Sequence, residues 1–317
     1  MSEEKIRLGI SSCLLGEKVR FDGSHKLDRF LTETLGRYVD YVPVCPEVEV
    51  GLPTPRETLR LVGTLDNQRL VFSKSGEDIT ERMTAWAQQR VKALEKENLC
   101  GFVFKSKSPS SGMERVRLYD RNGVPNKTGV GLFARIFMEH FPLLPVEEEG
   151  RLHDPRLREN FIETIFALKR WREALSKGQT AGNLVDYHTR HKLLIMSHSP
   201  DIYRQLGKLV AAAGKLPPDQ LYQDYLALLM KALHLRTTTA KQVNVLQHIL
   251  GYFKKQLSAD EKQEVISVIE SYRNKQVPLV VPLTLLNHFV RKYQQPYLLQ
   301  QVYLNPHPVE LKLRNHV

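Results

Sequence analysis

Residues Phe102 to Met113 read F-V-F-K-S-K-S-P-S-S-G-M, and we take this stretch to decide the fold. Its first three residues are apolar and strand-like, and the loop of Ser, Pro and Gly that follows turns away sharply. Two other stretches share this form, a short β-branched run followed by a turn with a thiol: Ile6–Ile10 before S-S-C-L-L-G, and Val39–Val44 before C-P-E. In an open α/β sheet, ligands bind outside the carboxyl ends of the strands. We therefore expect the three loops to meet in one site.

The size and composition of the chain limit the class of protein. With 317 residues, the chain is long enough for two domains that each have a hydrophobic core. Its three cysteines are too few, and odd in number, for a disulfide framework, so we expect a reducing cytoplasm. The first residues, M-S-E-E-K, lack the apolar core of a signal peptide, and no apolar run approaches the ~20 residues that a membrane helix needs. We expect a cytoplasmic protein without a membrane segment.

The first half of the chain has the pattern of an α/β domain. Residues 1–142 alternate strand-like and helix-like stretches, which is typical of a mainly parallel sheet with helices. Beside the three strands above, we expect strands at 60–62, 69–72 and 116–119, and helices at 28–35, 78–97 and 129–140. Asp78 to Glu81, D-I-T-E, resembles a capping box at the start of a helix. Residues 143–154, with Pro145 and Gly150, have the composition of a linker.

The second half, residues 155–317, shows no convincing strand pattern, and we expect an all-α domain there. The expected helices cover 156–176, 182–197, 200–213, 219–234, 238–257, 259–274 and 283–293. Residues Ser258 to Glu261, S-A-D-E, predict a second capping box.

The net charge of +11 is unevenly distributed. Residues 1–145 contain 22 Lys and Arg against 19 Asp and Glu, whereas residues 146–317 contain 24 against 16. A basic helical half is typical of contact with an anionic partner such as RNA or DNA. A solvated helical surface that is basic by composition alone fits the sequence equally well.

Cys13 and Cys45 each follow a strand directly. A cysteine within a strand is usually a small buried hydrophobe, but two cysteines in the loops after strands fit a metal site or reactive thiols as well. No Cys-x-x-Cys spacing occurs, so a zinc ribbon and a thioredoxin-type motif are excluded. In the helical half, His188 and His191 share a helix face, but without a third ligand we expect surface or capping histidines.

These motifs resemble those of the thiouracil desulfurase (TudS-like) family. They are S-S-C-L-L-G at 11–16, C-P-E at 45–47 and K-S-K-S-P-S-x-G at 105–112. The second half resembles the YbgA-like helical domain, in D-Y-H-T-R-H-K at 186–192, N-V-L-Q-H-I-L-G-Y-F-K at 244–254, V-P-L-V-V-P at 277–282 and Q-V-Y-L-N-P-H-P at 301–308. Together the two resemblances cover nearly the whole chain, as in the fused, RudS-type 4-thiouracil desulfidases.

The resemblance implies a desulfidase that converts 4-thiouracil-type pyrimidines, as base, nucleoside or nucleotide, to uracil and hydrogen sulfide. It also implies a 4Fe–4S cluster with one open iron, which would bind the soft thiocarbonyl sulfur and act as a Lewis acid without electron transfer. The implied ligand positions are Cys13, Cys45 and Ser111. Family members usually have Cys in place of Ser111, and a serine oxygen is a poorer iron ligand than a thiolate.

Glu47 matches the candidate acid/base of this family, and Ser108 is a candidate for orienting substrate or water. The alternatives are a surface glutamate and a serine that only forms the turn. Cys100 lies at the far end of the strand before Ser111, ~25–35 Å away at ~3.3 Å per residue, so we expect a core thiol. The competing interpretation of the whole chain is a nucleic-acid-associated binding protein whose cysteine site is structural or degenerate.

Overall fold

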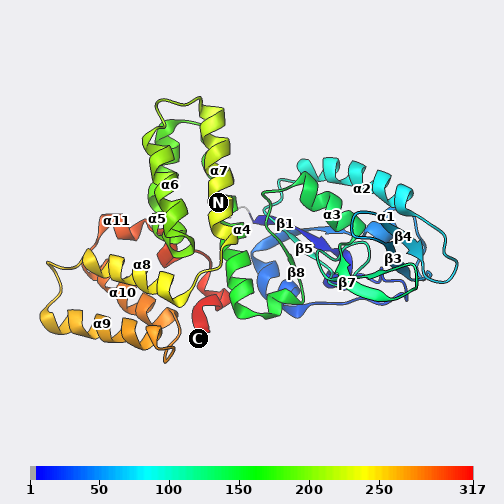
Figure 1. Cartoon of the computed structure of the whole chain (residues 1–317). Helices are drawn as coiled ribbons and strands as arrows, with labels where there is room; N and C mark the ends of the chain where they lie inside the picture. The colour runs from blue at the N-terminus through cyan, green and yellow to red at the C-terminus, as the bar shows by residue number, and fades with distance from the viewer. Residues whose placement is uncertain (1–4, 317) are drawn as a thin grey trace. The chain divides into compact units, whose positions relative to one another are not determined.

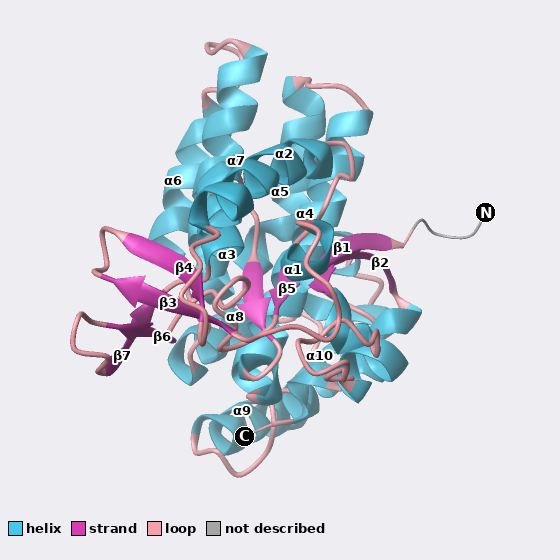
Figure 2. Ribbon diagram, turned by 90° about the vertical axis from the view of Figure 1, so that its right-hand side faces the viewer, coloured by secondary structure: helices cyan, strands magenta, loops and turns pink. Residues whose placement is uncertain are grey.

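The structure is a computed structural model that describes residues 5–316. Its residue contacts divide the chain after Asp154 into two compact units (Figure 1). The first unit is α/β and the second is helical, as the sequence predicts. Figure 2 shows the strands in magenta and the helices in cyan.

Sheet A contains four parallel strands in the order β2-β1-β5-β8. The strands are β1 (Ile6–Ser11), β2 (Val39–Val44), β5 (Phe102–Phe104) and β8 (Val146–Glu148). The chain leaves β1 toward β2 on one side and later returns to pair β5 on the other side. The strand order therefore reverses at β1, and such a switch point is where open α/β sheets bind ligands.

The segment 143–154, expected to be a linker, contains strand β8 of sheet A. It pairs with β5 in parallel register, the amide of Phe102 donates to the carbonyl of Pro145 (3.0 Å), and the short turn η4 (Arg151–His153) follows. The first unit thus continues to Asp154 rather than ending at 142. A three-residue strand between a proline and a glycine is too short to show a periodic pattern.

Sheet B is a second four-stranded sheet in the order β4-β3-β6-β7. Strands β3 (Leu59–Gly63), β4 (Gln68–Phe72) and β6 (Val116–Tyr119) lie where the sequence predicts strands. Strand β7 (Pro125–Gly129) was not predicted, because four of its five residues are exposed and show no alternation. It pairs antiparallel with β6, and the helix expected from 129 begins at Leu132 instead.

Helices α2 (Thr80–Glu95) and α3 (Leu132–His140) pack against one face of sheet A (Figure 1). Their core includes the buried rings of Phe102, Phe104, Phe133 and Phe137. The capping box predicted at the start of α2 is wrong: Asp78 accepts from the amide of Thr80 (2.8 Å), and the N-cap position, Ile79, makes no side-chain bond. In the region of the helix expected at 28–35, the chain forms a π-helical segment, η2 (Phe30–Thr34), and then a 3-10 turn, η3 (Leu35–Arg37), rather than an α-helix.

The second unit consists of helices and short helical turns within the described residues. They are α4 (Pro155–Ser176), α5 (Ala181–His198), α6 (Pro200–Ala211), α7 (Pro218–His234), α8 (Thr239–Gly251), α9 (Ala259–Arg273), α10 (Val280–Lys292), α11 (Pro296–Leu299), η5 (Val302–Leu304), η6 (Val309–Leu311) and η7 (Leu313–Asn315). Helix α5 contacts α4, α6, α7 and α8, and its Tyr187 packs against the buried ring of Trp171 in α4. The capping box of Ser258 and Glu261 is present at the start of α9, as predicted. In the described part of the chain, no helix combines the length and apolar character needed to cross a membrane.

Candidate functional site

The three loops predicted to form one site line a single cavity of about 340 Å³. It lies beyond the carboxyl ends of β1, β2 and β5, at the switch point of sheet A. The cavity brings together all five residues singled out from the sequence: Cys13, Cys45, Glu47, Ser108 and Ser111.

Cys13 lies in the short helical turn η1 (Ser12–Leu15) directly after β1. Gly16 ends this turn with a φ of +93°, a conformation that glycine adopts without strain. The Cys13 side chain is buried, and burial raises the pKa of its thiol to about 11, although the nearby Lys105 ammonium acts in the opposite direction. Without a metal, the thiol is therefore protonated at neutral pH.

Cys45 precedes the short helix α1 (Pro46–Glu49), and Pro46 occupies the first helical position, where a missing N–H costs nothing. The amide of Cys45 donates to a carboxylate oxygen of Glu49 (3.0 Å), and its thiol lies 4.0 Å from the carbonyl oxygen of Val19. Burial raises the pKa of the Cys45 thiol as well. Both thiols are thus held as neutral groups at the edge of one cavity.

The loop that carries Ser111 is fastened to the start of α3. The first three amides of this helix donate to the carbonyl oxygens of Pro109 and Ser110, at 2.9 to 3.3 Å, which satisfies donors that a helix start leaves open. Gly131 permits this approach, because a Cβ there would lie 2.7 Å from the carbonyl of Ser110. On the other side of the loop, the Ser108 hydroxyl accepts from the amide of Ser111 (3.2 Å). The position of residue 111 is therefore fixed by bonds of its loop backbone to α3 and to the Ser108 hydroxyl.

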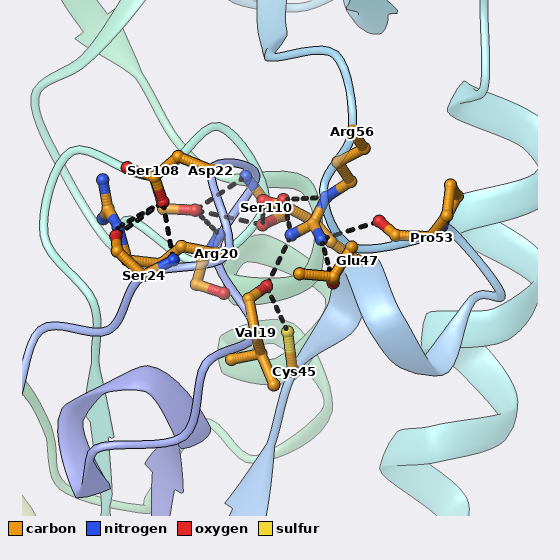
Figure 3. Close-up of polar contacts among 12 residues, drawn as sticks. Val19, Arg20, Asp22, Ser24, Cys45, Glu47, Pro53, Arg56, Ser108 and Ser110 are labelled. Carbon is orange, nitrogen blue, oxygen red and sulfur yellow. Dashed lines mark hydrogen bonds and ion pairs between the residues drawn. The ribbon is translucent and has the colours of Figure 1, made fainter.

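Glu47 is held by an arginine that the sequence did not single out (Figure 3). Two guanidinium nitrogens of Arg56 donate to Glu47 Oε2 (2.9 and 2.5 Å), and the hydroxyl of Ser110 donates to Oε1 (2.9 Å). The Arg56 side chain is only 3% exposed, and it also donates to the carbonyls of Val19 (2.9 Å) and Pro53 (3.2 Å). Glu47 is therefore an oriented carboxylate and not a loose surface side chain.

The acidic residues of the expected linker anchor the third loop. Glu149 accepts from the Lys105 ammonium (2.5 Å) and from the amide and hydroxyl of Ser106 (2.7 and 2.8 Å), and Glu148 accepts from the amide of Met113 (2.9 Å). Burial acts to raise the pKa of Glu149, but these donors hold it below its usual value. The sequence gives no sign of this role, because the loop partners of Glu148 and Glu149 lie 35 to 44 positions away.

A larger cavity of about 850 Å³ adjoins the first one and shares its lining at Thr58, Leu59, Ser106, Lys107 and Pro109. Its wall carries two carboxylates, Glu114 and Glu148, against six cationic side chains: Arg60, Lys107, Arg115, Arg117, Lys127 and Arg151. The surface beside the site therefore favours anionic groups.

Three other residues discussed from the sequence, Cys100, His188 and His191, do not line the 340 Å³ cavity. Cys100 is buried at the amino end of β5, where its amide donates to the carbonyl of Arg7 (2.8 Å). The expectation that His188 and His191 are surface or capping residues is wrong, because both are buried. His188 bonds the hydroxyl of Tyr225 (3.0 Å), and His191 bonds the carbonyl of Tyr187 (2.7 Å). Among residues 5–316, no group of three or more His, Cys, Asp or Glu side chains is arranged to hold a metal ion.

The side chains in the cavity fit an iron–sulfur cluster at two positions. Cys13 and Cys45 supply thiols, the donors that hold such clusters, and the cavity is lined by both. The third position, Ser111, supplies a hydroxyl in place of a thiol. A hydroxyl oxygen is a poorer donor to iron than a thiolate, so the third position fits a cluster less well than the other two.

Comparisons with known proteins agree with this architecture. Residues 8–149 match the family model described as 2-thiouracil desulfurase, and residues 192–308 match one described as a protein of unknown function (DUF1722). The uncharacterized protein YbgA of Escherichia coli (strain K12) is 32% identical over 161 residues, which is 50% of this chain and 95% of YbgA. The uncharacterized protein YbbK of Bacillus subtilis (strain 168) is 32% identical over 111 residues, which is 32% of this chain and 71% of YbbK.

The chain therefore belongs to the family described as 2-thiouracil desulfurase. Within it, this protein is a TudS-like domain fused to a YbgA-like domain. A solved structure described as the [4Fe-4S]-dependent thiouracil desulfidase TudS is 30% identical, covers 47% of this chain and 95% of that one, and has a TM-score of 0.39.

Proposed function

We propose that this protein is a non-redox desulfidase that converts 4-thiouracil-type pyrimidines to uracil and hydrogen sulfide with the help of a 4Fe–4S cluster. The observation that carries the proposal is the single cavity that combines two thiols, an oriented carboxylate and a turn of serines. Family membership supports thiouracil as the class of substrate.

Cys13, Cys45 and Ser111 are the proposed ligands. When bound there, a cluster with an open iron would supply a soft Lewis acid for the thiocarbonyl sulfur. Because the thiols are protonated when free, loading must displace their protons, so acquisition of iron should release acid.

Glu47 and Ser108 are the proposed catalytic residues. With Oε2 bound by Arg56 and Oε1 by Ser110, the Glu47 carboxylate is fixed at the cavity wall, where it can take a proton from an attacking water and pass it to the departing sulfur. The Ser108 hydroxyl lines the same cavity, where its proposed role is to orient water or substrate.

The decisive experiment is Ser111→Cys with anaerobic reconstitution. The exchange replaces a hydroxyl by a thiol at a fixed backbone position, so bound iron and sulfide released from 4-thiouracil should rise together. Glu47→Gln in the Ser111→Cys background should keep the iron and lose turnover. If Ser111→Cys changes neither iron content nor rate, the third ligand lies elsewhere or the protein holds no cluster.

Variants of the three cysteines compare thiols inside the cavity with a thiol outside it. Cys13→Ser or Cys45→Ser should abolish cluster binding, since each removes a thiol from a site that has only two. Cys100→Ala removes a buried thiol outside the cavity and should leave iron content unchanged. Reconstituted Cys13→Ser or Cys45→Ser protein with native iron content and absorbance would rule these residues out as ligands.

One observation favours a second role, contact of the helical unit with RNA or DNA. Residues 155–317 hold 23 Lys and Arg against 12 Asp and Glu, and the partly exposed Tyr252 stacks on Tyr297 with ring centroids 5.1 Å apart. Cations and exposed rings are what single-stranded nucleic acids bind. Binding of RNA that weakens steeply with salt would support this role, and salt-independent or absent binding would exclude it.

A further inference from the structure

Phe21 is an aromatic side chain left open at the mouth of the site. Its side chain is 36% exposed, and it lines the 340 Å³ cavity beside Cys13, Cys45 and Glu47. Among the described residues of that lining, Phe21 is the one with an aromatic ring. An exposed ring next to polar and thiol groups points to a ligand more than to the core.

The turn that carries Phe21 does not depend on burial of the ring for its shape. Asp22 accepts from the amide (3.0 Å) and the hydroxyl (2.5 Å) of Ser24, and Arg20 closes the turn through backbone bonds to Ser24 and Gly23 (3.2 and 2.9 Å). The Arg20 guanidinium also donates to the Ser24 hydroxyl (3.1 Å), as Figure 3 shows. The bonds from Ser24 lower the pKa of Asp22, so the carboxylate acceptor persists at neutral pH.

The same turn is bonded to the residue that holds Glu47. The amide of Arg56 donates to the carbonyl of Phe21 (2.8 Å), and its guanidinium donates to the carbonyl of Val19 (2.9 Å). That guanidinium also binds Glu47. The ring and the carboxylate are therefore fixed on one hydrogen-bonded frame.

Arg20 lies over one face of the Phe21 ring, 5.4 Å from its centroid, which polarises the ring and restrains it. Planar heteroaromatic rings stack on aromatic faces in offset or tilted arrangements.

We propose that Phe21 is the stacking surface for the pyrimidine ring, and that the 19–24 turn is a preformed base-binding element. The identity of the ring rests on the proposed function. The stacking itself does not, because it requires neither iron nor sulfur. Uracil and 4-thiouracil should therefore both bind the chain as purified, without a cluster.

The test measures dissociation constants of uracil and 4-thiouracil for the full chain by equilibrium dialysis. Phe21→Leu should raise both constants about 5- to 150-fold, the range for loss of one base–aromatic stack, whereas Phe21→Tyr should stay close to native. The control Leu65→Ala removes an exposed apolar side chain outside the cavity and should change neither constant. In a reconstituted active protein, Phe21→Leu should raise KM and leave kcat nearly unchanged.

Two outcomes overturn the stacking surface: a native protein that binds neither ring, or a Phe21→Leu variant that binds as tightly as native. Ring binding that depends on Phe21, in a protein that never releases sulfide, would keep the stacking surface and refute the desulfidase. Sulfide release with the same KM in Phe21→Leu and native protein would support the desulfidase and refute the stacking surface.

Discussion

Replacing Arg56 by Met would test whether one buried guanidinium holds the site together. The substitution keeps most of the aliphatic stem and removes all bonds to Glu47, Val19 and Pro53. The Arg56 side chain is 3% exposed and that of Glu47 16%, so the pair is largely shielded from water. Removing one partner of a buried ion pair costs about 3–5 kcal/mol, because the other charge is left uncompensated. With a urea dependence of ~2 kcal/mol per M, the unfolding midpoint of the first unit should fall by about 1.5–2.5 M.

The assay can follow the first unit separately, because the two tryptophans lie in different units, Trp86 in α2 and Trp171 in α4. In a Trp171→Phe background, fluorescence reports unfolding of the first unit through Trp86. Arg29→Met is the matched control, since that side chain is 83% exposed and should leave the midpoint unchanged. Adding Glu47→Gln to Arg56→Met should recover part of the loss, because the stranded charge is then gone. A midpoint for Arg56→Met equal to that of Arg29→Met would refute this account of the frame.

Two further changes test other parts of the structure. Glu149→Gln should accelerate amide hydrogen exchange in residues 105–113, because the Lys105 and Ser106 donors lose their anionic acceptor. Mass spectrometry would measure this exchange. Unchanged exchange would show that the loop is held without the Glu149 carboxylate. Burial lowers the pKa of His191 to about 3, so between pH 3 and about 6.5 the unfolded chain binds a proton that the folded chain does not. The stability of the helical unit, followed by urea unfolding through Trp171, should therefore fall by about 1.4 kcal/mol for each pH unit below 6.5 from this residue. His191→Gln should reduce that slope, and an identical slope would mean that His191 is not the group responsible.

The strands that carry the site could be predicted because apolar composition and loop chemistry coincide there. The observed bounds of β1, β2 and β5 match the expected ones to within a residue, and the meeting of three loops followed from the position of parallel strand ends. Regular helices in the second half were found for a similar reason, since each shows apolar spacing and several begin at a Ser or Thr cap.

What the sequence did not reveal depends on contacts between distant residues. Strand β8 has three residues, and its partner β5 lies more than forty positions earlier. Arg56 follows a proline-rich loop without any pattern, and only the fold shows that it reaches Glu47 and Val19. The D-I-T-E sequence before α2 failed as a capping box because the Asp78 carboxylate accepts from the amide of Thr80 (2.8 Å) and forms an ion pair with Arg69, in strand β4. In these cases, contacts between residues far apart in the sequence determined the structure more than the local sequence pattern did.

The way residue 111 is held has a consequence for the history of this site. The loop around it is fixed by its own backbone, by α3 and by the Ser108 hydroxyl, and these bonds do not use the side chain of residue 111. Serine and cysteine differ by one atom, and a single base change in a codon exchanges them. A lineage can therefore lose or regain a thiolate donor at this position while the protein keeps its shape and stability. Under the proposed function, relatives that fold alike would differ in iron content according to residue 111, and fold similarity alone would not separate the two groups.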